Sequence, residues 1–286
     1  RFHSEYSITD GIVRIDPMIH AVLEGGGAAV GISDLMNVFG GLRFYTHALA
    51  AGLKPILGCD LKVINPKDLN KPFRLGVLCM NHEGYHSLSV LLTKAFLTNN
   101  DAARGLVDPK WFDDGGSEGL IALSGAAQGE LGSLLLGKKW ALAHEAAERF
   151  KAQFPGRFYV ELQRAGRPTD ELATARLANF AVEEKLPVVA THPIQFLKPE
   201  DFEAHEVRCS IAEGYTLQDP RRVKRYTPEQ YLKSEAEMCE LFADIPAAIE
   251  NTVEIAKRCN LDGVLSKPQL PLFPTPDGMS LDDYID

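Results

Sequence analysis

Imidazole and carboxylate side chains stand where they could serve a metal-dependent hydrolase. They lie near the start of the chain or in and after short apolar runs, at His3, Asp10, Asp34, Asp60 and His192. Histidine nitrogens and carboxylate oxygens are ordinary ligands of zinc and of other metals that activate water. The residue types therefore favour a metal site, provided that the fold brings these positions together.

Short apolar runs alternate with longer amphipathic stretches up to residue 198. The apolar runs predict strands, and the stretches between them predict helices. The predicted strands are 28–33, 55–63, 74–80, 120–123, 159–162 and 187–191. Continuous apolar strands separated by helices are typical of parallel βα units buried on both faces. This number of units favours an α/β barrel, with its site at the C-terminal ends of the strands, and leaves an open sheet as the alternative.

Beyond residue 198 the pattern becomes helical, at 200–213, 227–242 and 245–260. Four prolines then follow within residues 268–276. Proline interrupts both helices and inner strands, so the last part of the chain is predicted to be an extended connector. We expect a barrel over about 1–198, a helical part over about 199–260, and a connector over 261–286 that leads into a longer protein.

The amino-acid composition limits the classes of function that the chain could have. The chain has 286 residues, of which 45% are hydrophobic and 24% charged, as in ordinary globular proteins. A net charge of −9 disfavours direct binding to a nucleic-acid backbone. The five cysteines form no close pair, which disfavours a zinc knuckle or disulfide framework and favours a cytoplasmic location. No apolar run approaches the length of a membrane span.

Other motifs give weaker indications. His82, Glu83 and His86 have the HExxH spacing of some zinc sites, but no third ligand is in sight, and a solvated helix start is the favoured interpretation. The glycine-rich stretches 25–27 and 124–129 lack the spacing of phosphate-binding loops and predict tight turns. No GxSxG nucleophile elbow occurs.

Several segments resemble PHP domains, the polymerase and histidinol phosphatase family. The opening RFHSEYSITDG resembles the family's HxH(S/T)xYSxxDG, and the next segment, GISDLMNVFGGLRFY, resembles (I/L)TDHGNxxGxxxFY. Later segments resemble the form found at the N-terminus of proteobacterial DNA polymerase III alpha subunits: KPILGCDLKV, GLIALSG, YVELQRAGRP and CELFADIPAAIENTVEIAKRCN. The similarity runs through nearly the whole chain in the same order.

The resemblance implies a distorted (βα)7 barrel with a C-terminal helical extension. In active members of the family a trinuclear metal cluster lies at the barrel mouth. Here His3 and Asp10 are retained, Asp60 replaces a longer Glu, and Asp34 remains beside a lost histidine. Other positions that carry metal ligands in the family hold Arg1, Leu35, Arg74, Ala126, Ala165, Pro193 and Gln195. Leu and Ala cannot donate, and Arg repels a cation, so we expect a vestigial site without catalytic residues or a cofactor. A weak mononuclear site at His3, Asp10 and Asp60 is the alternative.

The resemblance also implies partners. The intact protein would be a DNA-directed DNA polymerase whose Mg²⁺-binding palm lies outside this chain. The proofreading exonuclease subunit would dock on this domain, while DNA, the sliding clamp and the clamp loader would contact other domains. No membrane is involved. The rival functions are a metal-dependent phosphoesterase or 3'-5' exonuclease in the barrel itself, and a DNA-binding module.

Two positions that hold metal-binding histidines in the family hold arginines here. This predicts that guanidinium groups supply the positive charge that metal ions supply in active members. Buried carboxylates without cations repel one another, and a guanidinium can bind a carboxylate through two parallel bonds. We predict that Arg1 or Arg74 forms an ion pair with Asp10, Asp34 or Asp60. Arg1 is the less favoured of the two, because first residues are often frayed.

Overall fold

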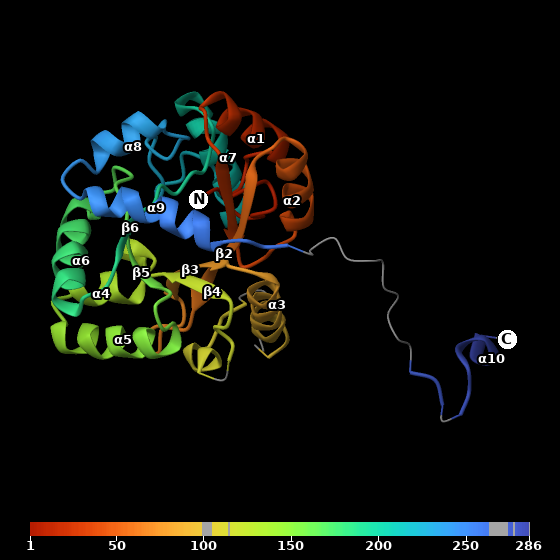
Figure 1. Ribbon diagram of the computed structural model, residues 1–286. Helices are drawn as coiled ribbons and strands as arrows, with labels where there is room; N and C mark the ends of the chain where they lie inside the picture. Colours follow the sequence, from red (N-terminus) through yellow and green to blue (C-terminus); the bar gives the residue numbers. More distant parts are fainter. Residues whose placement is uncertain (99–104, 114, 263–273, 277, 286) are drawn as a thin grey trace.

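The computed structural model describes residues 1–98, 105–113, 115–262, 274–276 and 278–285. Six strands form one sheet whose spatial order follows the sequence, and helices pack around its outer face (Figure 1). The strands are β1 (Ala29–Leu35), β2 (Lys54–Val63), β3 (Phe73–Cys79), β4 (Leu120–Leu123), β5 (Phe158–Leu162) and β6 (Val188–Ala190). Each predicted strand is present, with ends that shift by one or two residues at most.

Strand β3 runs against both of its neighbours, whereas the remaining pairs are parallel. The expectation of parallel units throughout is therefore wrong at this strand. The connection between β2 and β3, residues 64–72, contains no crossover helix, and antiparallel neighbours need only a short connection. The reversal brings the start of β3 to the edge where β2 ends, with Arg74 opposite Lys62 and Gly76 opposite Asp60.

The opening segment fills the remaining place in the barrel. Phe2 forms parallel bridges with Ile32 of β1 and with Ile194, which follows β6. Its backbone N–H donates to Gly31 O at 3.2 Å, and the His3 N–H donates to Ile194 O at 3.1 Å. Residues 1–3 therefore close the sheet between its first and last strands. The predicted α/β barrel class is confirmed in this form.

The helices agree with the sequence pattern except in three places: at α4, in the predicted helix 227–242, and at α10 within the predicted connector. The helices are α1 (Ile15–Glu24), α2 (Gly41–Ala50), α3 (His82–Leu97), α4 (Glu130–Leu136), α5 (Trp140–Gln153), α6 (Asp170–Glu184), α7 (Phe202–Glu213), α8 (Glu235–Leu241), α9 (Pro246–Arg258) and α10 (Leu281–Ile285). Helix α4 was not predicted. None of the described helices has the length and apolar character needed to cross a membrane.

The predicted helix 227–242 is wrong over its first half. Residues 227–234 are not helical, and Tyr231 forms a bridge with Phe196. Helix α8 begins only after Ser234, whose side chain accepts a hydrogen bond from the Glu237 N–H in a capping box. Residues 263–273 of the predicted connector lie outside the described residues. The prediction of an extended connector is wrong near its end, where Ser280 precedes helix α10 and its hydroxyl accepts a hydrogen bond from the Asp283 N–H. The domain limits at 198 and 260 stay predictions.

Alternation along the strands creates two apolar clusters. Outward-facing residues such as Leu57, Leu61 and Val77 pack in the large cluster under the surrounding helices. Inward-facing residues form a smaller cluster that Ile255 and Cys259 of helix α9 complete. Its strand members are Ile56, Leu78, Ile121, Leu123, Tyr159 and Val189. Helix α9 lies across the sheet at this cluster (Figure 1). The polar inward-facing residues farther along the strands, such as Asp60 and Arg74, form the barrel mouth.

Candidate functional site

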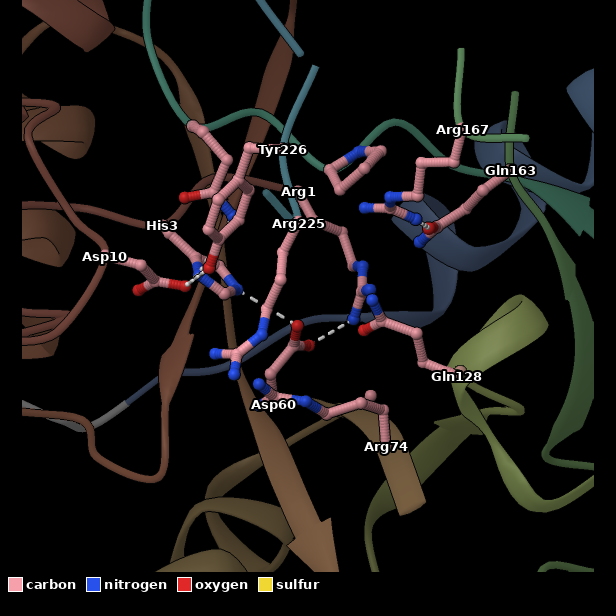
Figure 2. A pocket seen from close by; sticks show the side chains of 14 residues that line it. Arg1, His3, Asp10, Asp60, Arg74, Gln128, Gln163, Arg167, Arg225 and Tyr226 are labelled. Carbon is pink, nitrogen blue, oxygen red and sulfur yellow. Dashed lines mark hydrogen bonds and ion pairs between the residues drawn. The ribbon is translucent and has the colours of Figure 1, made fainter. Parts of the chain in front are cut away.

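A small cavity of about 90 Å³ lies at the barrel mouth (Figure 2). Its walls come from the opening segment, from β2 and β3, from the segments that follow β4, β5 and β6, and from the loop between α7 and α8. Basic side chains outnumber acidic ones along the walls. The basic residues are Arg1, His3, Arg74, Arg167 and Arg225, and the acidic residues are Asp10 and Asp60. The sequence predicts this place for His3, Asp10, Asp60, Arg1 and Arg74.

His3 lies between two carboxylates. Its Nδ1 is 3.0 Å from Asp10 Oδ2, and its Nε2 is 3.0 Å from Asp60 Oδ2. Burial alone would lower the pKa of His3, but the charges of Asp10 and Asp60 outweigh burial and raise that pKa to about 10. The ring is therefore an imidazolium that donates to a carboxylate from each nitrogen.

Arg1 supplies a second positive charge to the same carboxylates. Its Nη1 forms a short ion pair with Asp60 Oδ1, and its Nη2 lies 3.0 Å from Glu161 Oε1. Burial opposes ionisation of Asp60, yet the charges of Arg1 and His3 lower the pKa of Asp60 to about 2. The predicted ion pair is present, and Arg1, the less favoured candidate, forms it. Fraying does not occur because Phe2 and His3 are hydrogen-bonded into the sheet.

Glu161 is a site residue that sequence reasoning missed. It is fully buried on β5 and accepts hydrogen bonds from the Gly125 N–H at 3.1 Å and from Gln163 Nε2 at 3.1 Å. The Thr191 hydroxyl and Arg1 bind its Oε1 as well. A carboxylate inside the otherwise apolar run YVEL was the available sign, because charged residues are almost never fully buried unless paired.

The loop between α7 and α8 reaches into the mouth. Tyr226 donates its hydroxyl to Asp10 Oδ2 at 3.0 Å, and Ser7 donates to Asp10 Oδ1 at 2.7 Å. Burial opposes ionisation of Asp10, but the charge of His3 outweighs it and holds the pKa of Asp10 well below its ordinary value. Arg225 extends from the same loop toward Asp60 in Figure 2. Both oxygens of Asp10 are thus occupied by donors of this chain.

Arg74 also lines the cavity, but without an ion pair. Among the residues that the structure describes, no carboxylate lies within salt-bridge distance of its guanidinium, and its Nη1 is buried without a hydrogen-bond partner. Its charge nevertheless acts on Asp10 and Asp60, since it contributes to the lowered pKa of each. The arginine favoured from the sequence therefore faces the cavity unpaired.

The other positions singled out from the sequence divide into two groups. Pro193 and Gln195 line the cavity, and the Gln195 amide contacts His3 Nδ1 at 3.2 Å. The second group is not among the lining residues: Asp34, Leu35, Ala126, Ala165 and His192.

Those residues make other contacts. Asp34 accepts from the Ser4 N–H at 2.6 Å and from the Ser4 hydroxyl at 2.8 Å. His192 contacts the Glu229 carbonyl at 2.8 Å, and burial lowers the pKa of His192 to about 4. The HExxH pair is exposed at the start of helix α3, in agreement with the solvated helix start favoured above.

The described side chains do not fit a metal ion as they stand. Both nitrogens of His3 are bound to carboxylates, and a guanidinium occupies the Asp60 oxygen that a cation would need. Within the described part of the chain, no group of three or more His, Cys, Asp or Glu side chains is arranged to hold one. As arranged, the described side chains at the mouth form a network of ion pairs.

Comparison with known proteins gives a consistent result. The sequence profile of the PHP domain family matches residues 1–165. The chain is 48% identical over 287 aligned residues to "DNA polymerase III subunit alpha" of Neisseria meningitidis serogroup B, and 42% identical over 285 to the protein of that name from Escherichia coli K12. These alignments cover all of this chain but only 25% and 24% of the two relatives. The chain therefore spans about a quarter of their length.

A solved structure shows a remote likeness. An amidohydrolase from Chromobacterium violaceum matches with a TM-score of 0.45 and 12% sequence identity, over 68% of this chain and 86% of that one.

Proposed function

Because the chain belongs to the PHP domain family, we propose that it is the PHP domain of a cytoplasmic replicative DNA polymerase of the alpha-subunit type. The identity to two such subunits along the full length of the chain supports this. Since the chain covers a quarter of those proteins, nucleotide addition would be carried out elsewhere in the intact protein, in a palm that binds Mg²⁺. Contacts with DNA, the sliding clamp and the clamp loader would also belong to other domains.

The barrel mouth in this proposal stabilises the domain and performs no hydrolysis. One observation carries it: His3 is held between Asp10 and Asp60, and Arg1 is paired with Asp60. Positive charges built into the chain stand where a metal hydrolase would place cations. A carboxylate that already accepts from two cationic side chains is a poor metal ligand, because binding a metal would require breaking both contacts.

Hydrolysis of p-nitrophenyl phosphate with added Mn²⁺ tests this role. We expect no rate above that of buffer containing Mn²⁺. The rival phosphoesterase or exonuclease function predicts a Mn²⁺-dependent rate that Asp60→Asn abolishes and that Arg43→Met, an exposed substitution on α2, leaves intact. Such a rate would contradict the proposed structural role.

We further propose that this domain docks the proofreading exonuclease subunit. The net charge of −9 supports a protein partner over direct binding to DNA, whose backbone is itself negative. Sedimentation of the purified chain with the purified exonuclease subunit should give a stoichiometric complex, while the chain alone should pass through a single-stranded DNA column at moderate salt. Salt-dependent retention on the column without a complex would favour the rival DNA-binding module.

A further inference from the structure

A cavity of about 350 Å³, the outer cavity, lies on the outer side of the barrel and shares no lining residue with the mouth. Its walls come from the connection between β2 and β3, from the start of β3 and from helices α4 and α5, which pack against each other (Figure 1). We propose that the outer cavity binds a small amphipathic monocarboxylate, that is, an apolar or aromatic group that carries one carboxylate. This inference goes beyond the proposed function and does not depend on it.

The apolar part of the outer cavity can hold the body of such a ligand. Phe73 and Leu134 are partly buried and pack against the main apolar cluster, which fixes their positions. Leu142, in the same wall, is 39% exposed, and Ala146 is buried. Covering apolar surface of this kind stabilises a complex by about 25 cal/mol per Å². The volume also falls in the range of small-molecule sites, about 300–1,000 Å³, which are lined mainly by such side chains.

Three basic residues of the outer cavity can hold the carboxylate. Lys67 and Lys139 are exposed, and within the described part of the chain neither ammonium has a carboxylate at salt-bridge distance. The Arg149 guanidinium is held by an ion pair with Glu130 and lies 5.1 Å from the centroid of the Phe150 ring. Its Nε is nevertheless buried without a hydrogen-bond partner among the described residues. Because a buried charged donor without an acceptor is costly, an acceptor from a ligand would be favoured there.

The charge balance selects an anion with a single charge. Two carboxylates also line the outer cavity: Glu130, which Arg149 already binds, and Glu145, which is exposed. With three basic residues against two acidic ones, the wall carries an excess of one positive charge. A carboxylate matches that excess and accepts strong hydrogen bonds from guanidinium and ammonium groups. A doubly charged phosphate ester would exceed it and would be repelled by Glu145.

Calorimetry and thermal melting of the 286-residue chain with phenylbutyrate test the proposal, at fixed ionic strength and without divalent metal. Three related probes separate the parts of the ligand. Phenylbutyramide keeps the ring and lacks the charge, acetate keeps the charge and lacks the ring, and phenylpropyl phosphate carries two charges. We expect saturable binding of phenylbutyrate, binding of the amide and of the phosphate ester that is weaker by about tenfold or more, and no measurable binding of acetate.

Ser133→Phe is the decisive variant, because it fills the outer cavity from helix α4. Ser133 lines the cavity and is only partly buried, and its hydroxyl lies 3.5 Å from the Ala127 carbonyl, so the loss of this long contact should cost little stability. We expect Ser133→Phe to melt near the wild-type temperature and to bind no phenylbutyrate. Val182→Phe is the matched control, since it adds the same ring at a residue of α6 that is 79% exposed, and it should bind as the wild type does.

Charge variants test the polar part of the site. Arg149→Lys keeps the positive charge but removes Nε, so phenylbutyrate should bind about tenfold more weakly. Lys139→Met should weaken binding by up to about fivefold, the range of an exposed ion pair. Glu145→Gln removes a like charge and should strengthen binding by a similar factor. Arg43→Met, on helix α2 and outside the cavity, should leave the affinity unchanged.

The outcomes decide the proposal separately from the proposed function. Absence of saturable phenylbutyrate binding to the wild type would overturn it, and so would equal affinity for the acid and the amide. Binding that persists in Ser133→Phe would place the ligand elsewhere and would also overturn it. The polymerase role and the metal-free mouth would stand in each of these cases, because neither involves the outer cavity.

Discussion

At the scale of single residues, the barrel mouth is a chain of alternating charges. Asp10, His3, Asp60, Arg1 and Glu161 follow one another, each in contact with the next. Asp10, His3, Asp60 and Glu161 are buried, and the Arg1 side chain is only 12% exposed, so each charge depends on its neighbour for a compensating partner. Removing one partner leaves a buried charge uncompensated. The resulting loss of stability is larger than the net stability that the intact ion pair contributes.

The substitution Arg1→Met tests that dependence. It leaves Glu161, which is fully buried, without its cationic partner and deprives Asp60 of one of two. We expect the free energy of unfolding to fall by about 3–5 kcal/mol in urea titrations. Arg43→Met breaks the pair with Asp16, whose two side chains are about half exposed, and should cost about 0–1 kcal/mol. Equal small losses in both variants would show that the buried network contributes nothing.

His3 should make stability depend on pH in a defined direction. Its pKa is raised in the folded state to about 10, so its contribution is complete below the unfolded value of about 6.5 and is lost as pH rises toward 10. Relative to His3→Gln, the wild type should lose up to about 1.4 kcal/mol of unfolding free energy per pH unit in that window. Asp60 acts at the other limit: its pKa is lowered to about 2, so its contribution is lost as pH falls below about 4. A constant difference between wild type and His3→Gln from pH 6.5 to 9.5 would contradict the imidazolium.

At the scale of elements, the strands and most helices could be predicted because their apolar periodicity is strong. Strand direction could not, since residues 73–79 have the same alternation whether the strand runs parallel or antiparallel. Residues 227–234 carry a helix-like pattern, but tertiary contacts hold them, including the bond from the Thr227 hydroxyl to the Ala165 carbonyl. Local propensity is too weak to reveal such contacts.

Tertiary contacts also limited which site residues could be predicted from the sequence. His3, Asp10, Asp60 and Arg74 were found because a family pattern marks their positions. Glu161, Arg167 and Tyr226 were not, since only the closed barrel brings them to the mouth. Arg1 was the less favoured candidate for the ion pair, because the sequence does not reveal that its neighbour Phe2 closes the sheet and holds the first residues in place.

The turn after β4 is the element on which the mouth depends most closely. Gly125 has φ +79°, donates its N–H to Glu161, and a Cβ at this position would overlap the Arg74 carbonyl. Gly125→Ala should therefore lower the unfolding free energy by about 3 kcal/mol or more, from left-handed backbone and overpacking together. Gly52 has the same φ with open space around it, so Gly52→Ala should cost only about 1 kcal/mol. Similar losses in the two variants would rule out a tight approach at Gly125.

At the scale of the whole molecule, the acidic balance and the basic mouth are compatible. The chain carries a net charge of −9, yet five of the seven charged side chains that line the cavity are basic. The excess negative charge therefore lies elsewhere on the protein, where it affects which partners the surface attracts. The charge at the mouth itself is mainly positive.

Chelation should not affect the stability of the molecule. A metal stabilises a fold only by binding the native state, so a chain whose mouth is closed by its own cations gains nothing from one. Melting curves with and without EDTA should coincide. A fall of several degrees in EDTA, reversed by added Mn²⁺ or Zn²⁺, would mean that a metal contributes to the folded state.

Elemental analysis of the purified 286-residue chain tests most directly whether ion pairs have replaced the metal cluster. After dialysis against a mild chelator we predict well below one atom of zinc, manganese or iron per chain, because Asp60 is already bound to both His3 and Arg1. A stoichiometric transition metal that survives that dialysis, and that is lost in Asp60→Asn, would contradict the account.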